Sequence, residues 1–325
     1  MQTPGPVPHD PAANLVVYSA AFKPFCHSLL AGFAKAQPGV SLQFVDGVST
    51  DLHTHYLDLH QRGEALPDVI WSSAMDLQMA LVRLGHARSH RSAHAQALPA
   101  WARYKDLAFC TTLEPLVGLR HTQHLGPQEG VSTLQELADL MQQRPDLLRQ
   151  RMACLDIEAN GMGFLAMLVA RAQDRGYGRF IDLAVGMGLQ GHGSNPPLVQ
   201  ALVSESAVLA FPVLGAFAAR AVAAHSQLAV CTSPAARLGV SRVALIPNGA
   251  PHPEQAACFV DFLLSPAGQD GMREDGLFPW KDQGQSDVLP AMVVQPLPID
   301  DGFAPWLDPA AREALRQDWA RLHLA

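Results

Sequence analysis

Cysteine is scarce in this chain, and its pattern excludes several kinds of site. Five cysteines occur in 325 residues, an odd number with no Cys-x-x-Cys spacing. This pattern predicts neither a zinc site nor a disulfide framework. Three lie in apolar helix- or strand-like stretches, where a free cysteine behaves as a small hydrophobic residue. We therefore expect structural or incidental roles for Cys26, Cys110, Cys154, Cys231 and Cys258.

Two further absences narrow the class of protein. Lysine and arginine number 23 against 30 acidic residues, a formal net charge of −7, so no binding of nucleic acid or of an anionic membrane is expected. The longest apolar stretch, 207–224, is interrupted by Pro212, Gly215 and Arg220, so no membrane span is expected. The proline-rich residues 1–13 lack the apolar core of a secretory signal, and we expect them to form a disordered segment.

The remaining chain reads as a globular α/β protein of more than one domain. A length of 325 residues exceeds most single cores. Apolar β-type runs alternate with helix-type periodicity, which predicts parallel, doubly wound sheets with ligands at the carboxyl ends of the strands. The expected strands are 15–19, 41–45, 68–71, 111–120 (interrupted at Glu114-Pro115), 152–156, 207–211, 228–231 and 243–246.

Local signals also predict where several helices begin. Ser132 with Gln135 has the spacing of a capping box. Asn195, followed by two prolines, is expected to cap the next helix. After the strand 207–211, a helix is expected over 213–224.

The stretch 243–280, VALIPNGAPHPEQAACFVDFLLSPAGQDGMREDGLFPW, is the most informative. It predicts a strand, a helix started by Pro253, a restart at Ser265-Pro266 and a second helix that stops at Gly276. It resembles the "GAPHPEAA…FIDFLLSPEGQ" segment of bacterial extracellular solute-binding proteins, the receptors of uptake systems. The resemblance spans about 15–281 and is strongest to the ferric-iron, sugar-phosphate and aminophosphonate branch.

The resemblance implies a type II periplasmic-binding-protein fold. Such a fold has two lobes, each a doubly wound α/β sheet, joined by crossover strands with a ligand cleft between them. Lobe 1 is then expected over 14–113 and 236–285, and lobe 2 over 114–235 and 286–325.

Several loops become candidates for ligand binding on the same basis. The loop Trp71-Ser72-Ser73-Ala74 resembles the family's "DVVWSGD", and 156–163 is placed like "DPxxSGTG", with Asn160 and Met162 at the Ser and Thr positions. Because Met162 cannot donate a hydrogen bond, the departure disfavours bare phosphate and favours a larger ligand with an apolar portion. Ordinary turns and helix capping are the alternative interpretation. The expected ligand-binding residues are Ser19, Ala20, Ser49, Thr50, Ser72, Ser73, Asp156, Asn160, Gly161, Met162, Gly163, His192, Ser194, Asn195 and Phe211.

A bound metal is not expected. Iron receptors of this family use two adjacent tyrosines near the strand that corresponds to 207–211, whereas this chain continues Phe211-Pro212-Val213 and has four tyrosines, none of them adjacent. Two groups of histidines lack cysteines or convergent carboxylates at ligand spacing and are interpreted as solvated surface residues. They are His53, His55 and His60, then His86, His90 and His94.

The leading hypothesis is a periplasmic, monomeric receptor that closes by a hinge on a small anionic solute, an organophosphate, phosphonate or carboxylate. It would have no cofactor and no catalytic residue, and would deliver the solute to an inner-membrane ABC permease. The sequence would then be a mature chain or have a misplaced start; an unusual cytoplasmic member is less favoured. The alternatives are a receptor that feeds a sensor kinase of a two-component system, an enzyme with Cys26, Cys110 or Cys154 as nucleophile, and a scaffold that binds no small molecule.

Overall fold

The computed structural model describes residues 12–127, 129, 131–231, 238–289 and 293–323. The chain forms two compact units. Unit 1 comprises Met1–Leu113, Ser241–Lys281 and Leu297–Phe303, and unit 2 comprises Glu114–Val240, Asp282–Pro296 and Ala304–Ala325. The expected disordered segment, 1–13, falls almost wholly outside the described residues, as does the expected return to lobe 1 at 236.

Unit 1 is built on a sheet with the strand order β2-β1-β3-β13-β6-β5, in which β4 also pairs with β13. The strands are β1 (Leu15–Ser19), β2 (Leu42–Asp46), β3 (Val69–Ser72), β4 (Ala87–Arg88), β5 (Arg103–Tyr104), β6 (Ala108–Cys110) and β13 (Val243–Pro247). Strands β1, β2 and β3 are parallel, as expected, but β13 runs antiparallel to β3 because it starts beside Ser72, where β3 ends. The sheet is therefore mixed.

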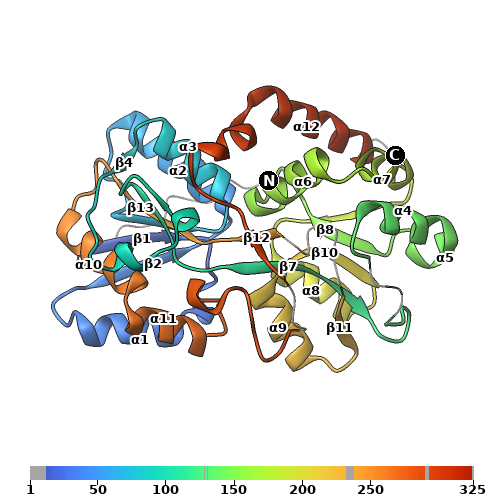
Figure 1. The fold of residues 1–325 in the computed structure, drawn as a ribbon, viewed down its shortest axis with the longest axis horizontal. Helices are drawn as coiled ribbons and strands as arrows, with labels where there is room; N and C mark the ends of the chain where they lie inside the picture. The colour runs from blue at the N-terminus through green and yellow to red at the C-terminus, as the bar shows by residue number, and fades with distance from the viewer. Residues whose placement is uncertain (1–11, 128, 130, 232–237, 290–292, 324–325) are drawn as a thin grey trace. The chain divides into compact units, whose positions relative to one another are not determined.

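Helices lie on both faces of this sheet, with α1 and α11 on one side and α2 and α3 on the other (Figure 1). The helices of unit 1 are η1 (Lys23–Phe25), α1 (His27–Ala36), α2 (Ser49–Arg62), α3 (Met75–Arg83), η2 (His94–Ala97), η3 (Ala100–Ala102), α10 (Pro253–Leu264) and α11 (Pro266–Glu274). Two short helices extend across the unit boundaries, η4 (Trp280–Asp282) and η5 (Asp301–Leu307).

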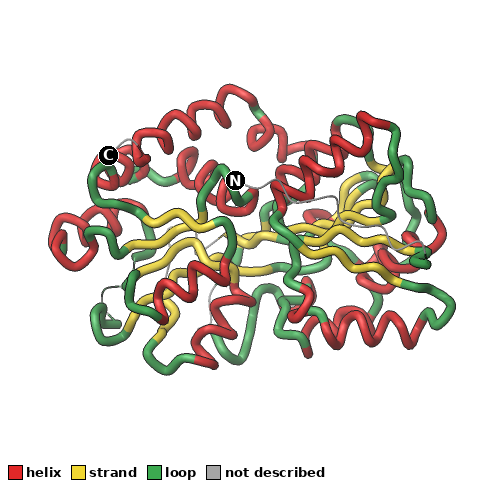
Figure 2. Tube along the Cα trace, turned by 180° about the vertical axis from the view of Figure 1, so that it is seen from behind, coloured by secondary structure: helices red, strands yellow, loops and turns green. Residues whose placement is uncertain are grey.

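Unit 2 repeats the layered plan with the strand order β14-β12-β7-β10-β8-β9, and β11 pairs with β7. Its strands are β7 (Glu114–His121), β8 (Met152–Leu155), β9 (Gln190–His192), β10 (Leu209–Leu214), β11 (Leu228–Cys231), β12 (Leu238–Val240) and β14 (Gln295–Pro296). Its helices are α4 (Leu134–Gln143), α5 (Pro145–Leu148), α6 (Gly161–Gln173), α7 (Tyr177–Ala184), α8 (Asn195–Val203), α9 (Gly215–Ala224) and α12 (Pro309–His323). Figure 2 shows each sheet as a layer of strands with helices on both sides. The α/β class predicted from the sequence is confirmed.

Two predicted helix starts in unit 2 are wrong by one residue. Helix α4 is capped by Thr133, whose side chain accepts a hydrogen bond from the Glu136 N–H at 3.1 Å, and Glu136 reaches back to the Ser132 N–H at 2.6 Å. The capping residues are therefore Thr133 and Glu136, each one position after the predicted Ser132 and Gln135. Helix α8 has Ser194 at its N-cap, and Asn195 is its first residue.

Two predicted strand limits are also wrong because proline is tolerated at irregular or terminal positions of a sheet. Strand β10 continues through Pro212 to Leu214. Its register against β7 shifts between Ala210 and Val213. Pro212 lies within this shift, so its missing N–H interrupts no regular hydrogen-bonded pair of the two strands. Strand β7 begins at Glu114 and includes Pro115 without interruption. Helix α9 accordingly starts at Gly215 and not at 213.

The informative stretch 243–280 folds as predicted into β13, α10 and α11. Ser265 caps α11, and its hydroxyl oxygen accepts a hydrogen bond from the Gly268 N–H at 3.1 Å while donating to the Phe262 carbonyl at 2.7 Å. The buried Gln269 amide donates to the Thr111 carbonyl at 3.0 Å and to the Leu263 carbonyl at 2.8 Å. The motif that resembles the family thus fixes the junction of two helices and ties it to the sheet.

Gly268 is required at this junction, and its replacement is expected to destabilise the protein. A Cβ atom added there would lie 1.9 Å from the Phe262 carbonyl oxygen, so the backbone must shift. We expect Gly268→Ala to lower the free energy of unfolding by about 1–3 kcal/mol in urea denaturation. The control is Gly178→Ala in helix α7, where a Cβ meets nothing within 4 Å. There, alanine should be neutral or stabilising by up to about 1 kcal/mol. Equal effects at the two positions would contradict the steric argument.

Within the described residues, no helix combines the length and the apolar character needed to span a bilayer.

Candidate functional site

The carboxyl ends of three parallel strands meet at one edge of the unit 1 sheet. The register pairs Ser19 at the end of β1 with Asp46 on β2 and with Trp71 on β3. The segments at these strand ends therefore lie next to one another, and they include Ala20 after β1, Ser49 at the start of α2 and Ser72 at the end of β3. We call this edge the unit 1 rim. It carries all six of the residues that the sequence predicts for this lobe.

Ser19 and Ala20 shape the rim. The fully buried Ser19 hydroxyl donates to the Trp71 carbonyl at 3.0 Å and accepts from the Ala21 N–H at 3.0 Å. The Ala20 N–H donates to the same Trp71 carbonyl at 3.1 Å. These contacts hold the turn after β1 against β3, as an ordinary βα turn requires.

Two helices that begin at the rim have apolar N-cap residues, which cannot accept a hydrogen bond from the first helical N–H groups. Helix α2 starts with Ser49 and Thr50 after Val48, and helix α3 starts after Ala74. Helix N-termini carry a partial positive charge and favour a bound anion. The rim therefore offers two N-termini whose N-cap residues cannot supply an acceptor side chain.

The paired serines before α3 have different roles. The Ser72 hydroxyl oxygen accepts a hydrogen bond from the Ala74 N–H at 3.1 Å, which stabilises the turn. The Ser73 carbonyl accepts from Met75 N–H at 3.0 Å, whereas its hydroxyl makes no hydrogen bond to another residue in the described part of the chain. Local capping explains Ser72 and leaves the Ser73 hydroxyl available to a ligand.

In unit 2, Asn160 joins the two loops that the sequence singles out. Its Oδ1 accepts from the Gly163 N–H at 2.8 Å, so it is the N-cap of α6, as predicted. Its Nδ2 donates to the Gly193 carbonyl at 3.0 Å. Asp156 adds a second link, because its N–H donates to the His192 carbonyl at 2.9 Å. The structure thus brings 156–163 and 192–195 together.

The start of α6 lies tightly against strand β8. A Cβ on Gly163 would come 2.7 Å from the Leu155 Cβ, so glycine permits this close approach. Met162 is buried, with 2% of its surface exposed. Gly161 and Met162, the first two residues of α6, have no polar side chain, so only their backbone groups could bind a ligand.

His192 and Asn195 have environments that limit how they could contact a ligand. Burial lowers the pKa of His192, so its imidazole is expected to be neutral near pH 7 and to act through hydrogen bonds without a full charge. Its Nε2 is buried and has no partner among the described residues. The Asn195 Oδ1 accepts from the Leu214 N–H at 3.1 Å, which attaches α8 to β10.

Phe211 lies in the core of unit 2. Its ring is 2% exposed and packs edge-to-face on Phe180, with ring centroids 5.9 Å apart. The same core takes Leu315 and Trp319 from α12. This geometry gives Phe211 a packing role.

Comparison with protein families identifies the chain. The family model described as "Bacterial extracellular solute-binding protein" matches residues 15–278. This chain belongs to that family. A comparison with curated proteins finds no match.

Solved structures of solute-binding proteins share its fold. The substrate-binding protein of an ABC transporter from Agrobacterium tumefaciens is 24% identical, with 96% of this chain and 95% of that chain covered and a TM-score of 0.87. Periplasmic AfuA from Actinobacillus pleuropneumoniae, with fructose-6-phosphate bound, is 17% identical over 97% and 100%, with a TM-score of 0.76. Iron-bound HitA from Pseudomonas aeruginosa is 14% identical over 95% and 98%, with a TM-score of 0.70. These likenesses confirm the predicted two-lobed fold.

Membership of the solute-binding family confirms the prediction of a binding protein rather than an enzyme. The cysteines considered as nucleophiles in the enzyme alternative are also buried. Burial raises the pKa of Cys110 to about 12 and also raises that of Cys154. Cys26 is fully buried. A protonated, inaccessible thiol is a poor nucleophile.

Several histidines that the sequence predicts to be solvated surface residues contact other side chains in the structure. The His60 and His86 ring centroids are 4.4 Å apart, and the Tyr56 hydroxyl lies 3.1 Å from the His86 Nδ1. Burial and the neighbouring His60 lower the pKa of His86. His90 pairs with Asp261 at 2.8 Å. The described residues contain no group of three or more histidine, cysteine or acidic side chains that could hold a metal ion.

One charged residue near the rim was missed in the sequence. Arg242 is 1% exposed and lies over the Trp71 ring, 5.9 Å from its centroid. The pairing of Val243 with Ser72 places Arg242 at the end of β3. The position of Arg242 directly before an apolar strand is a sequence signal for it, but its burial depends on residues far away in the sequence. Its guanidinium lies over Trp71, the residue directly before the predicted serines.

Proposed function

We propose that this solute-binding protein is the periplasmic, monomeric receptor of an ABC-type uptake system for a small organic anion. The ligand would be an organophosphate, a phosphonate or a carboxylate, and each unit would contribute residues to it as a hinge closes. The observation that carries the proposal is the start of α3. There, the Ser73 hydroxyl, which bonds no other residue in the part of the chain that the structure describes, precedes a helix N-terminus whose N-cap residue, Ala74, has no acceptor side chain.

The charge of the neighbouring residues supports an anionic ligand. Arg242 places a buried guanidinium beside the end of β3. Hydrogen bonds from hydroxyl groups, backbone N–H groups and a nearby cation stabilise a phosphate or carboxylate group. In unit 2, the Asn160 cap sets the start of α6, which offers a further N-terminus.

Known ligands of similar structures are consistent with an organic anion. AfuA was solved with fructose-6-phosphate, which is a phosphate ester. HitA holds iron, but this chain lacks the adjacent tyrosines expected of such a site. We therefore propose an organic anion and not a ferric ion as the solute.

The test is a ligand panel followed by thermal unfolding. It contains sugar phosphates, phosphonates, phosphoglycerates, di- and tricarboxylates, and polyamines as cationic controls. A ligand present at 100 times its dissociation constant should stabilise the protein by about 2.7 kcal/mol, and small-angle scattering should report compaction on closure. Absence of a shift with every anion, or a shift with polyamines alone, would exclude this function.

Two substitutions test the placement of the site. Ser72→Ala and Asn160→Ala should each weaken the binding of the identified anion about tenfold or more, because Ser72 holds the turn before α3 and Asn160 holds the start of α6, and these two helix N-termini are proposed to bind the anion. Asn160→Ala should also cost about 1 kcal/mol of stability through the lost cap. The exposed Ser206, which bonds the Ala201 carbonyl after α8, provides a control as Ser206→Ala. Unchanged affinity in both site variants would show that the ligand binds elsewhere.

A further inference from the structure

A small pocket opens between helices α2 and α3 of unit 1. Ser49, Leu52 and His53 recur at positions i, i+3 and i+4, and therefore lie on one face of α2. Leu77 and Leu81 are four residues apart on α3 and lie on one face of that helix. The remaining lining residues are Tyr18, Ala20, Ile70, Ser72 and Gln78.

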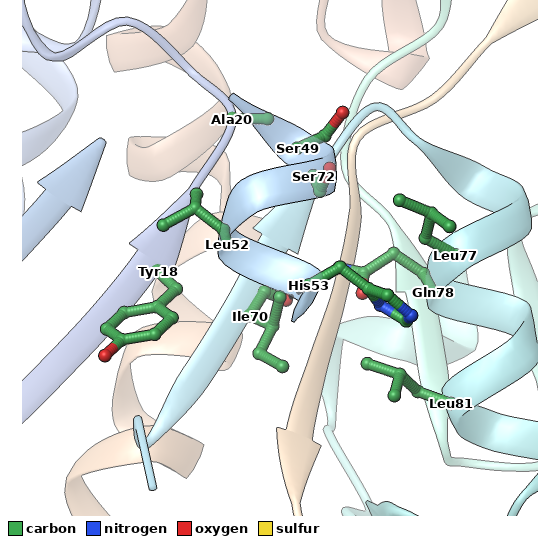
Figure 3. Close-up of a pocket in the computed structure, with 10 residues that line it drawn as sticks. All are labelled: Tyr18, Ala20, Ser49, Leu52, His53, Ile70, Ser72, Leu77, Gln78 and Leu81. Carbon is green, nitrogen blue, oxygen red and sulfur yellow. Dashed lines mark hydrogen bonds between the residues drawn. The ribbon is translucent and has the colours of Figure 1, made fainter. Parts of the chain in front are cut away.

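The pocket connects with the unit 1 rim. Three predicted ligand-binding residues, Ala20, Ser49 and Ser72, line it. Figure 3 shows these three side chains at one end of the pocket and Leu81 at the other, with Leu52, Ile70 and Leu77 between them. A ligand held at the rim would thus have a cavity directly beside it.

The walls of the pocket are mainly hydrocarbon. Leu81 is fully buried, and Leu52 and Ile70 are nearly so, at 9% and 7% exposed. The amide nitrogen of Gln78 is engaged, because it donates to the Ile70 carbonyl at 3.2 Å and to the Val243 carbonyl at 3.0 Å. The Ser72 hydroxyl oxygen is likewise engaged, because it accepts from the Ala74 N–H at 3.1 Å.

The size of the pocket limits what it can hold. It leaves about 10 Å³ for the centre of a water-sized sphere, which is close to the minimum for one water molecule. A single terminal methyl group matches both this size and the hydrocarbon walls. A longer chain would have to displace the leucines.

We propose that this pocket receives the non-ionic end of the ligand, and that the solute is a small organic anion with an arm of one or two carbons. The inference rests on the proposed function, since the charged head of the same ligand would lie at the unit 1 rim. Each buried methylene group should strengthen binding about fourfold until the pocket is full. The arm thus selects among anions that share the same head.

The test uses a series of n-alkylphosphonates from methyl to butyl, with straight-chain carboxylates as a second head group, in isothermal titration calorimetry. The wild-type protein should bind the methyl or ethyl member best and the butyl member at least tenfold more weakly. Leu81→Ala removes three carbons from the far wall and should move the optimum to propyl or butyl. Butyl affinity should then exceed the wild-type value at least tenfold.

Two further variants serve as a substitute for Leu81→Ala and as a control for loss of stability. Leu77→Ala enlarges the same pocket at a half-buried position, so it serves if Leu81→Ala fails to fold. Leu29→Ala on α1 removes an equally buried leucine outside the pocket and should leave the order of the series unchanged.

The outcomes separate this inference from the function on which it rests. If the wild-type protein binds no anion, then the proposed function fails and the inference fails with it. If it binds the series but both pocket variants keep the wild-type optimum, then only the inference is overturned. Tighter binding of inorganic phosphate than of every alkylated anion would also overturn it.

Discussion

Replacing Asp68 by alanine is expected to lower the free energy of unfolding by about 3–5 kcal/mol, because a buried carboxylate that accepts two backbone hydrogen bonds and contacts the His252 ring is lost. The Asp68 side chain is fully buried, and its Oδ2 accepts from the Val16 N–H at 2.8 Å. Its Oδ1 accepts from the His252 N–H at 2.6 Å, and the His252 Nδ1 lies 3.2 Å from Oδ2. One carboxylate thus joins β1, the start of β3 and the start of α10.

The Asp68 prediction is measured by urea unfolding with circular dichroism and tryptophan fluorescence. Asp68→Asn keeps the volume but leaves one acceptor oxygen for three donors, so its loss should be smaller than that of Asp68→Ala. Asp58→Ala removes an exposed aspartate from α2 in the same unit and should change stability by no more than about 0.5 kcal/mol. A loss below about 1 kcal/mol for Asp68→Ala would show that these contacts are replaced by water or by rearrangement.

Much of the fold could be predicted because its signals are local. Ser265 caps α11, Pro266 starts it and Gly276 stops it, and each acts through the nearest backbone groups. The strands before them are short apolar runs whose limits follow from the turn residues. Such features depend little on the rest of the chain.

Contacts between distant segments could not be predicted in this way. The side chain of Cys26, the N-cap residue of α1, makes no capping hydrogen bond to the helix, and Asp275 at the end of α11 caps it by accepting from the Ser28 and Leu29 N–H groups at 2.8 Å each. Nothing near residue 28 indicates this partner. The extra length of β10 past Pro212 has a similar cause, since it depends on the register against β7.

The candidate site shows the same division. The sequence correctly predicts the Asn160 cap, because Asn160 and Gly163 are three residues apart. It does not show that the Ser19 hydroxyl is used by neighbouring backbone groups or that Phe211 enters a core. It also misses Arg242, which reaches the rim through strand pairing. Residue type identifies loops that can bind an anion, whereas the direction of each side chain requires the tertiary structure.

Introducing a carboxylate at the rim should abolish anion binding without harming the fold. We expect Ser73→Asp to weaken the affinity for the organic anion at least a hundredfold, because two like charges about 4 Å apart repel by roughly 4 kcal/mol at an effective dielectric constant of about 20. Stability should fall by no more than about 1–3 kcal/mol, because Ser73 is 7% exposed and a buried carboxylate loses hydration, which its favourable interaction with the N-terminus of α3 offsets in part. The affinity is measured by titration calorimetry and the stability by thermal unfolding.

Ser73→Asn is the matched control, because it has the same shape without the charge. An asparagine can still donate a hydrogen bond, so its affinity should fall less than tenfold. The difference between the two variants therefore isolates the charge. Equal binding by Ser73→Asp and Ser73→Asn would show that no anion lies near the start of α3, whereas tighter binding by Ser73→Asp would indicate a cationic solute.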